Sequence, residues 1–316
     1  MSMEFRALAD QALADGAISA EEVLSLRHEG WQDGHIDSGE ADAIFELNEH
    51  LKLGSSEWCD FFVEAISEFI VNRTEPKGYV SDEQAMWLSD HVDRDGRLDS
   101  VTELELLVRI LEKAINVPAE MKDYALAQIE VAVLTGDGPT RDGGDLGGGC
   151  ITDAEVHLLR RMIFASGGDR PAAVSRNEAD MLFRIKDASL GNGNSEDWPQ
   201  LFVQGVGNYL QGFGGKEQLS RERAVELETF MNDTAVNIGR FFSRMASHTS
   251  GSGVSDGFSA MRDEAEPPRH IELEVAEAAE VTAGEQKWLK GKLDADGKLD
   301  ELEQALLDFL AEEDGL

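Results

Sequence analysis

The stretch VSDEQAMWLSDHVDRDGRLD, residues 80–99, returns near the end of the chain as VTAGEQKWLKGKLDADGKLD, residues 281–300. Aligned without gaps, the two copies match Trp87 to Trp288 and share the DG pair near their ends. In both, a segment with a central tryptophan precedes an acidic D-x-D-G stretch. The recurrence of so long a pattern indicates internal repetition, which governs any prediction of the fold.

A second repeat supports the first. SEWCDFFVEAISEFI (56–70) resembles SEDWPQLFVQGVGNYL (195–210), and five of their apolar residues match at a constant spacing of 140 positions. Two shorter pairs follow the same order upstream: GEADAIFEL (39–47) with NEADMLFRI (177–185), and ISAEEVLSL (18–26) with ITDAEVHLL (151–159). We therefore predict a tandem duplication in which each half holds the same ordered set of helices.

The repeated segments carry the periodicity of helices. In VTELELLVRILEKAI (101–115) and DELEQALLDFL (300–310), apolar residues recur every three to four positions, which places them on one helical face. Ala, Glu, Leu and Lys dominate, and the long alternating β-branched runs typical of strands are absent from the sequence. The sequence predicts an all-α protein of two tandem repeated helical modules, with helix–loop–helix elements like those of EF-hands.

Glycine-rich stretches set the expected boundaries. The first helical module spans 1–134, and TGDGPTRDGGDLGGG (135–149) follows as a Gly-rich linker. The main part of the second module spans 150–246. A flexible Gly-, Ser- and Pro-rich linker is expected at 247–270, and a C-terminal helix pair (271–316) completes the second module.

The chain is strongly acidic. Its 316 residues include 63 Asp and Glu against 28 Lys and Arg, a formal net charge of -35. Such a chain repels nucleic acids and anionic lipid surfaces, and no nucleic acid is expected as a partner. Divalent cations and basic proteins are attracted. A purely solubilising role for the charge is the alternative.

The chain carries no mark of export or membrane insertion. Its start, MSMEFRALADQALADG, has no basic region followed by an apolar core, and no apolar run approaches the length of a membrane span. With only Cys59 and Cys150, a reducing compartment is favoured over a disulfide framework. We predict a cytoplasmic protein without an integral membrane segment.

A short signature precedes most predicted helices. A glycine able to adopt a positive φ is followed by an aliphatic residue that can enter the core, and then by Ser, Thr or Asp as the helix cap. A Glu or Gln three residues after the cap completes a capping box. The expected boxes are Ser19/Glu22, Asp37/Glu40, Ser81/Gln84, Thr152/Glu155 and Asp300/Glu303. In the loop at 91, where Asp99 is the expected cap, the glutamate comes one residue late, at Glu103.

The same signature is the second half of an EF-hand calcium loop, whose glycine is position 6 and whose last ligand is a glutamate at position 12. Two loops add an Asp at position 3, but Lys292 and His91 stand at their first positions. The candidate metal ligands are Asp294, Asp296, Asp300 and Glu303 in the second loop, and Asp93, Asp95, Asp99 and Glu103 in the first. Calcium is the expected ion, with magnesium or another divalent ion as alternatives.

Capping alone also explains these loops, since it accounts for the glycine, the aliphatic residue, the cap and the glutamate without any metal. The additional Asp at position 3 distinguishes 91–99 and 292–300 from the other loops. Of the two, the second is the stronger candidate, because only it keeps the glutamate in register.

The segment ALADGAISAEEVLSL resembles the start of a TerB-like helical domain, the fold associated with tellurite-resistance proteins. The matching residues are Ala14, Asp15, Gly16, Ile18, Ser19 and Glu22, with a weaker echo at Gly149, Ile151, Thr152 and Glu155. The resemblance covers the first helix pair of each half. It implies a compact all-α domain with acidic, metal-associated residues and a role in stress or metal response, with no known catalytic activity.

The one G-x-S-x-G string, GVSDG (253–257), falls in the linker expected at 247–270 and not at a strand-to-helix turn, and the sequence contains no H-E-x-x-H motif, so no enzymatic activity is predicted. The leading hypothesis is an acidic cytoplasmic protein that binds a divalent cation, calcium above all, in a TerB-like stress or metal-handling context. The competing hypothesis is a non-catalytic interaction scaffold. Its acidic surface would hold a basic protein partner, and its DG loops would only cap helices.

Overall fold

The computed structural model describes residues 3–32, 34–51, 55–93, 98, 100–141, 148–165, 167, 174–210, 283–294 and 299–313. Within these residues the chain forms twelve α-helices and no strand, which confirms the all-α prediction. The helices are α1 (Met3–Asp15), α2 (Ala20–Gly30), α3 (Ser38–His50), α4 (Ser56–Asn72), α5 (Asp82–Val92), α6 (Val101–Lys113), α7 (Ala119–Thr135), α8 (Asp153–Ile163), α9 (Arg176–Ser189), α10 (Trp198–Leu210), α15 (Ala283–Leu293) and α16 (Glu301–Glu313).

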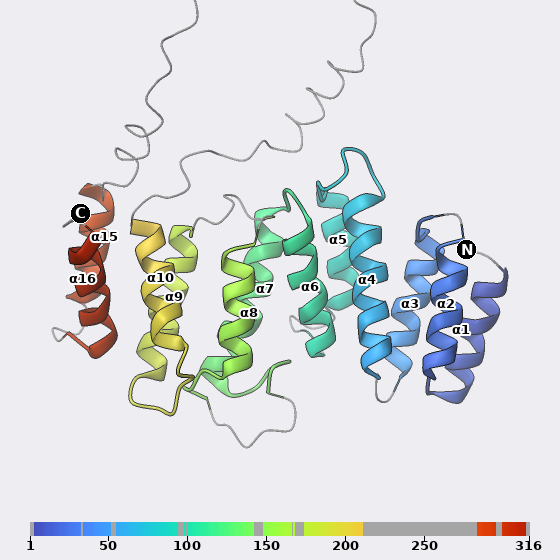
Figure 1. Cartoon of the computed structure of the whole chain (residues 1–316), viewed down its shortest axis with the longest axis horizontal. Helices are drawn as coiled ribbons and strands as arrows, with labels where there is room; N and C mark the ends of the chain where they lie inside the picture. The colour runs from blue at the N-terminus through green and yellow to red at the C-terminus, as the bar shows by residue number, and fades with distance from the viewer. Residues whose placement is uncertain are drawn as a thin grey trace, which may run out of the picture.

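The helices stand side by side in a long row, with α1 at one end and the pair α15 and α16 at the other (Figure 1). Close packing joins α1 to α3, α4 to α6, α7 to α9 and α10 to α16. The last pair therefore continues the row, although residues 211–282, including the predicted linker at 247–270, lie outside the described residues. No helix in the described part of the chain is long and apolar enough to cross a bilayer.

Capping boxes begin most of the helices. In each box the cap side chain accepts a hydrogen bond from the backbone N–H three residues on, and the side chain at that position accepts one from the N–H of the cap. The five predicted boxes are confirmed: Ser19/Glu22, Asp37/Glu40, Ser81/Gln84, Thr152/Glu155 and Asp300/Glu303. A further box, Ser175/Glu178, begins α9.

One cap differs from the prediction. The cap of α6 is Ser100, not Asp99. Ser100 Oγ accepts a hydrogen bond from Glu103 N–H at 3.3 Å, and Ser100 N–H donates to Glu103 Oε2 at 3.2 Å. A capping box requires a spacing of three residues, so the glutamate that comes late for an EF-hand is in register for a helix cap. Asp99 itself lies outside the described residues.

Two aromatic clusters of like geometry lie in the core, one in each half. The ring centroids of Trp87 (α5) and Phe45 (α3) are 5.5 Å apart, and those of Trp288 (α15) and Phe183 (α9) are also 5.5 Å apart. The other ring pairs that match in sequence agree as well: Phe45–Phe62 and Phe183–Phe202 at 5.2 Å, and Phe69–Trp87 at 5.0 Å against Tyr209–Trp288 at 4.8 Å. These like spacings allow each residue to be compared with its sequence match in the other half.

Candidate functional site

The candidate metal ligands lie in different surroundings. Asp93 and Asp294 follow the ends of α5 and α15, where their backbone N–H groups donate to Ser89 O at 2.8 Å and Lys290 O at 2.9 Å. Glu103 completes the capping box of α6. The three that lie outside the described residues are Asp95, Asp99 and Asp296.

Asp300 and Glu303 meet a third carboxylate, that of Asp187 on α9. One oxygen of each lies within 4.8 Å of the others. The Nζ of Lys186, whose side chain is 1% exposed, lies 2.8 Å from Glu303 Oε1 and 2.8 Å from Asp187 Oδ1, and it also donates to Asp300. A cation that belongs to the protein therefore already sits among the carboxylates considered for calcium.

The surroundings of Lys186 keep it charged. Burial disfavours the ammonium, but hydrogen bonds to Asp187, Asp300 and Glu303 outweigh burial and raise the pKa of Lys186 above its usual value. The lysine is therefore a cation at every physiological pH. A divalent ion would enter this cluster only against that charge.

The first half has an amide at the equivalent place. Asn48 matches Lys186 at the spacing of 138 that also relates Glu40 to Glu178. Asn48 Nδ2 donates to Glu103 Oε1 at 3.4 Å, and its Oδ1 accepts from Trp58 Nε1 at 3.1 Å.

Lysine has no acceptor atom, so Lys186 cannot accept a hydrogen bond from Trp198, the residue that matches Trp58. Trp198 Nε1 is buried and has no hydrogen-bond partner within the described ranges. The alignment of the halves was the signal that could have identified Lys186, because it matches a charged side chain to the half-buried amide of Asn48.

Other buried capping glutamates also have cationic partners. Glu155, which is 0% exposed, accepts from the guanidinium of Arg141 at 2.8 and 2.9 Å, and Glu178 Oε1 lies 2.7 Å from Lys122 Nζ. Arg141 comes from the predicted linker at 135–149, so part of that segment packs against α8. Each pair connects a helix start to another part of the chain, which is a structural use of the carboxylates.

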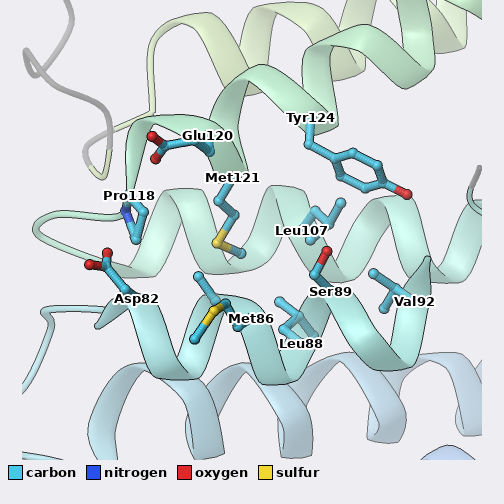
Figure 2. A pocket seen from close by; sticks show the side chains of 11 residues that line it. Asp82, Met86, Leu88, Ser89, Val92, Leu107, Pro118, Glu120, Met121 and Tyr124 are labelled. Atoms are coloured by element: carbon cyan, nitrogen blue, oxygen red, sulfur yellow. The ribbon is translucent and has the colours of Figure 1, made fainter. Parts of the chain in front are cut away.

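A groove of about 470 Å³ opens between α5, α6 and α7. Met86 and Met121 face each other across its middle (Figure 2). Met86 is 61% exposed and forms part of the apolar lining of the groove. The apolar lining is Ala85, Met86, Leu88, Val92, Leu107, Pro118 and Met121.

Polar groups lie at the ends of this groove. The carboxylates of Asp82 and Glu120 lie at one end on either side of Pro118, and Tyr124 lies at the other (Figure 2). The sequence predictions did not include this groove. The available signal was Met86, an apolar residue whose sequence match in the second half is Lys287.

Comparisons with known proteins add no identity. No protein-family model, no curated protein and no solved structure matches the chain. The resemblance to TerB-like domains therefore stays a prediction, and any function must be argued from the groove and the carboxylates.

Proposed function

We propose that the chain is a non-catalytic helical scaffold that holds a basic, amphipathic segment of a partner protein in the groove between α5, α6 and α7. The observation that carries the proposal is the exposure of Met86 within an apolar groove that has acidic side chains at one end. Grooves between helices accept the apolar face of a further helix. Methionine suits such a surface because its unbranched side chain adapts to different partners.

Charge supports a basic occupant. Asp82 and Glu120 lie at the end of the groove, where Lys or Arg residues beside an apolar stripe would meet them. The formal charge of -35 adds long-range attraction, which increases association rates for basic partners more than it increases their final affinity.

In this proposal the DG loops are helix caps, and the two halves are copies of one ancestral module. The matched aromatic spacings support the duplication, and the internal pairing of Glu155, Glu178 and Glu303 supports the structural role of the loops. A stress-related, TerB-like context for the scaffold is part of the proposal.

The test uses a labelled amphipathic Leu/Lys peptide and the full chain, with fluorescence anisotropy at physiological ionic strength. Met86→Lys puts a positive charge into the groove and should weaken peptide binding about tenfold. Leu24→Lys is the matched control: Leu24 is 64% exposed on α2, and the substitution changes the net charge equally.

Equal loss of affinity in the two variants would show attraction to the acidic surface alone and would contradict the groove. An acidic Leu/Glu peptide that binds as well as the basic one would contradict the proposed chemistry of the partner.

Calcium binding is a second candidate function, favoured by one observation, the convergence of Asp187, Asp300 and Glu303. Calorimetry with calcium and magnesium tests it on the intact protein. Calcium binding with an accompanying rise in Tm would support this candidate, whereas no heat at millimolar ion would contradict it.

A further inference from the structure

A second concavity, of about 700 Å³, lies between α9 and α15 and is lined by more basic than acidic side chains. Its lining is Arg176, Asp180, Gly284, Lys287, Trp288, Gly291 and Lys292. Three basic side chains thus surround one carboxylate, in a chain where carboxylates outnumber basic residues 63 to 28.

The one carboxylate of the pocket is already engaged. Asp180 Oδ1 accepts hydrogen bonds from Lys292 Nζ at 2.7 Å and from Trp288 Nε1 at 3.0 Å. Burial opposes ionisation of Asp180, but these bonds outweigh burial and lower its pKa. Asp180 therefore remains an anion whose charge is balanced by Lys292.

Two positive charges remain to act on the pocket. Arg176 approaches Asp180 only to 3.9 Å, and its side chain is 66% exposed. Lys287 makes no ion pair within the described part of the chain. Since interactions between exposed charges fade over about 8 Å at physiological salt, these neighbouring cations act on the pocket more strongly than the distant carboxylates of the molecule do.

The helices of the first half that match α9 and α15 in sequence are α3 and α5, and they lack the basic residues of this pocket. Trp87 and Trp288 keep the same ring contacts, but the residues around them differ. In the first half, the six matching positions hold three carboxylates and no Lys or Arg. They are Ser38, Asp42, Glu83, Met86, Asp90 and His91. The matching residues of the second half are Arg176, Asp180, Gly284, Lys287, Gly291 and Lys292.

Glycine supplies the space. Gly284 and Gly291 stand where the first half has Glu83 and Asp90, so two acidic side chains are replaced by open volume. A Cβ added at Gly291 would meet no atom within 4 Å. Glycine inside a helix lowers helix stability by roughly 1 kcal/mol relative to Ala, so its presence here is not explained by helix formation.

We propose that this pocket binds a small multivalent oxyanion of the phosphate class, held by Arg176 and Lys287. The planar guanidinium presents paired N–H groups that match two phosphate oxygens, and the lysine supplies a point charge. The volume is sufficient for a phosphorylated small molecule. The inference is independent of the proposed scaffold function, since it concerns different helices.

Isothermal titration calorimetry of the full chain with inorganic pyrophosphate, in EDTA at physiological ionic strength, tests the site. Lys287→Met and Arg176→Ser each introduce the residue of the first half and should weaken binding about tenfold. Lys290→Met is the matched control. It removes the same charge from the same helix, but Lys290 lies on the other pocket of α15, beside Leu289 and Leu293, so affinity should stay within twofold of wild type.

Two substitutions of Gly291 separate the effect of charge from the effect of side-chain shape. Gly291→Asp should abolish binding, whereas the isosteric Gly291→Asn should retain most of it, because only the aspartate returns the acidic character of the first half. Absence of pyrophosphate binding to the wild type would overturn the proposal. Equal weakening by Lys287→Met and Lys290→Met, or citrate binding as tight as pyrophosphate, would overturn it too.

Discussion

Glu303 uses its two carboxylate oxygens for different purposes. Oε2 accepts from the backbone N–H of Asp300 at 3.1 Å and so caps α16, while Oε1 accepts from Lys186 at 2.8 Å. The carboxylate is 2% exposed, and a buried charge of this kind is stable only while its partners remain. The same atoms that a calcium ion would require are therefore the ones that hold α16 to α9.

Replacing Lys186 by Met should be severely destabilising, by about 3–5 kcal/mol, because it leaves the buried carboxylate of Glu303 without its cation. Thermal unfolding followed by circular dichroism measures the loss. We expect millimolar calcium to restore part of the Tm of the Lys186→Met variant, because the ion can then replace the ammonium among Asp187, Asp300 and Glu303.

The exposed Lys290→Met substitution serves as the control for loss of a positive charge and should leave Tm nearly unchanged. If Lys186→Met is as stable as wild type, the ammonium does not compensate the cluster, and the structural interpretation of these carboxylates is wrong.

At the scale of elements, the helix starts were the most predictable features. The glycine, aliphatic residue, cap and glutamate are local, so five capping boxes followed directly from the sequence. The cap of α6 could not be predicted in this way, because Asp99 and Ser100 are adjacent and both residue types can cap a helix. The position of Glu103 decides between them, since only Ser100 stands three residues before it.

Ser100→Ala should lower the free energy of unfolding by about 1 kcal/mol, since it removes the acceptor for the N–H of Glu103. Ser25→Ala is the comparison: the Ser25 hydroxyl only donates back to Glu21 O within α2, so its loss should change stability by less than about 0.5 kcal/mol. Urea unfolding measures both. An equal effect of the two substitutions would contradict Ser100 as the cap.

The candidate sites were less predictable than the helices. The cluster around Lys186 joins α9 to the start of α16, more than a hundred residues later, and no local pattern encodes that contact. The groove at Met86 depends on how α7 packs beside α5, and the phosphate-class pocket depends on differences between the halves. Periodicity predicts which face of a helix is buried, but it does not say where packing between helices is incomplete.

At the scale of the whole molecule, Arg161 is one of the side chains that connect the two halves of the row. Arg161 on α8 donates to Glu105 at 2.6 and 2.7 Å and to Glu112 at 2.7 and 2.9 Å, and both glutamates belong to α6. These hydrogen bonds outweigh burial and lower the pKa of Glu112. They also raise the pKa of Arg161, which stays charged throughout.

Arg161→Met should destabilise the protein by about 1 kcal/mol at pH 7, a small value because the partly exposed groups remain in contact with solvent. Because the pKa of Glu112 is lower in the folded state, folding favours its ionised form. The stabilisation by the Arg161–Glu112 pair is therefore complete above the ordinary pKa of 4.5. It is lost as the pH falls through the lowered pKa of the folded state. The difference between variant and wild type should therefore shrink below pH 4.5. Urea titrations over this range measure it, and a constant difference would contradict the assignment.

The row also has a consequence for the entropic cost of folding. The helices α4 and α5 are joined by residues 73–81, whereas 72 residues, 211–282, separate their counterparts α10 and α15. By chain length alone, closing the longer connection costs about 2 kcal/mol more in entropy than closing the shorter one. By this measure the first half completes its core at a lower entropic cost than the end of the row formed by α10, α15 and α16.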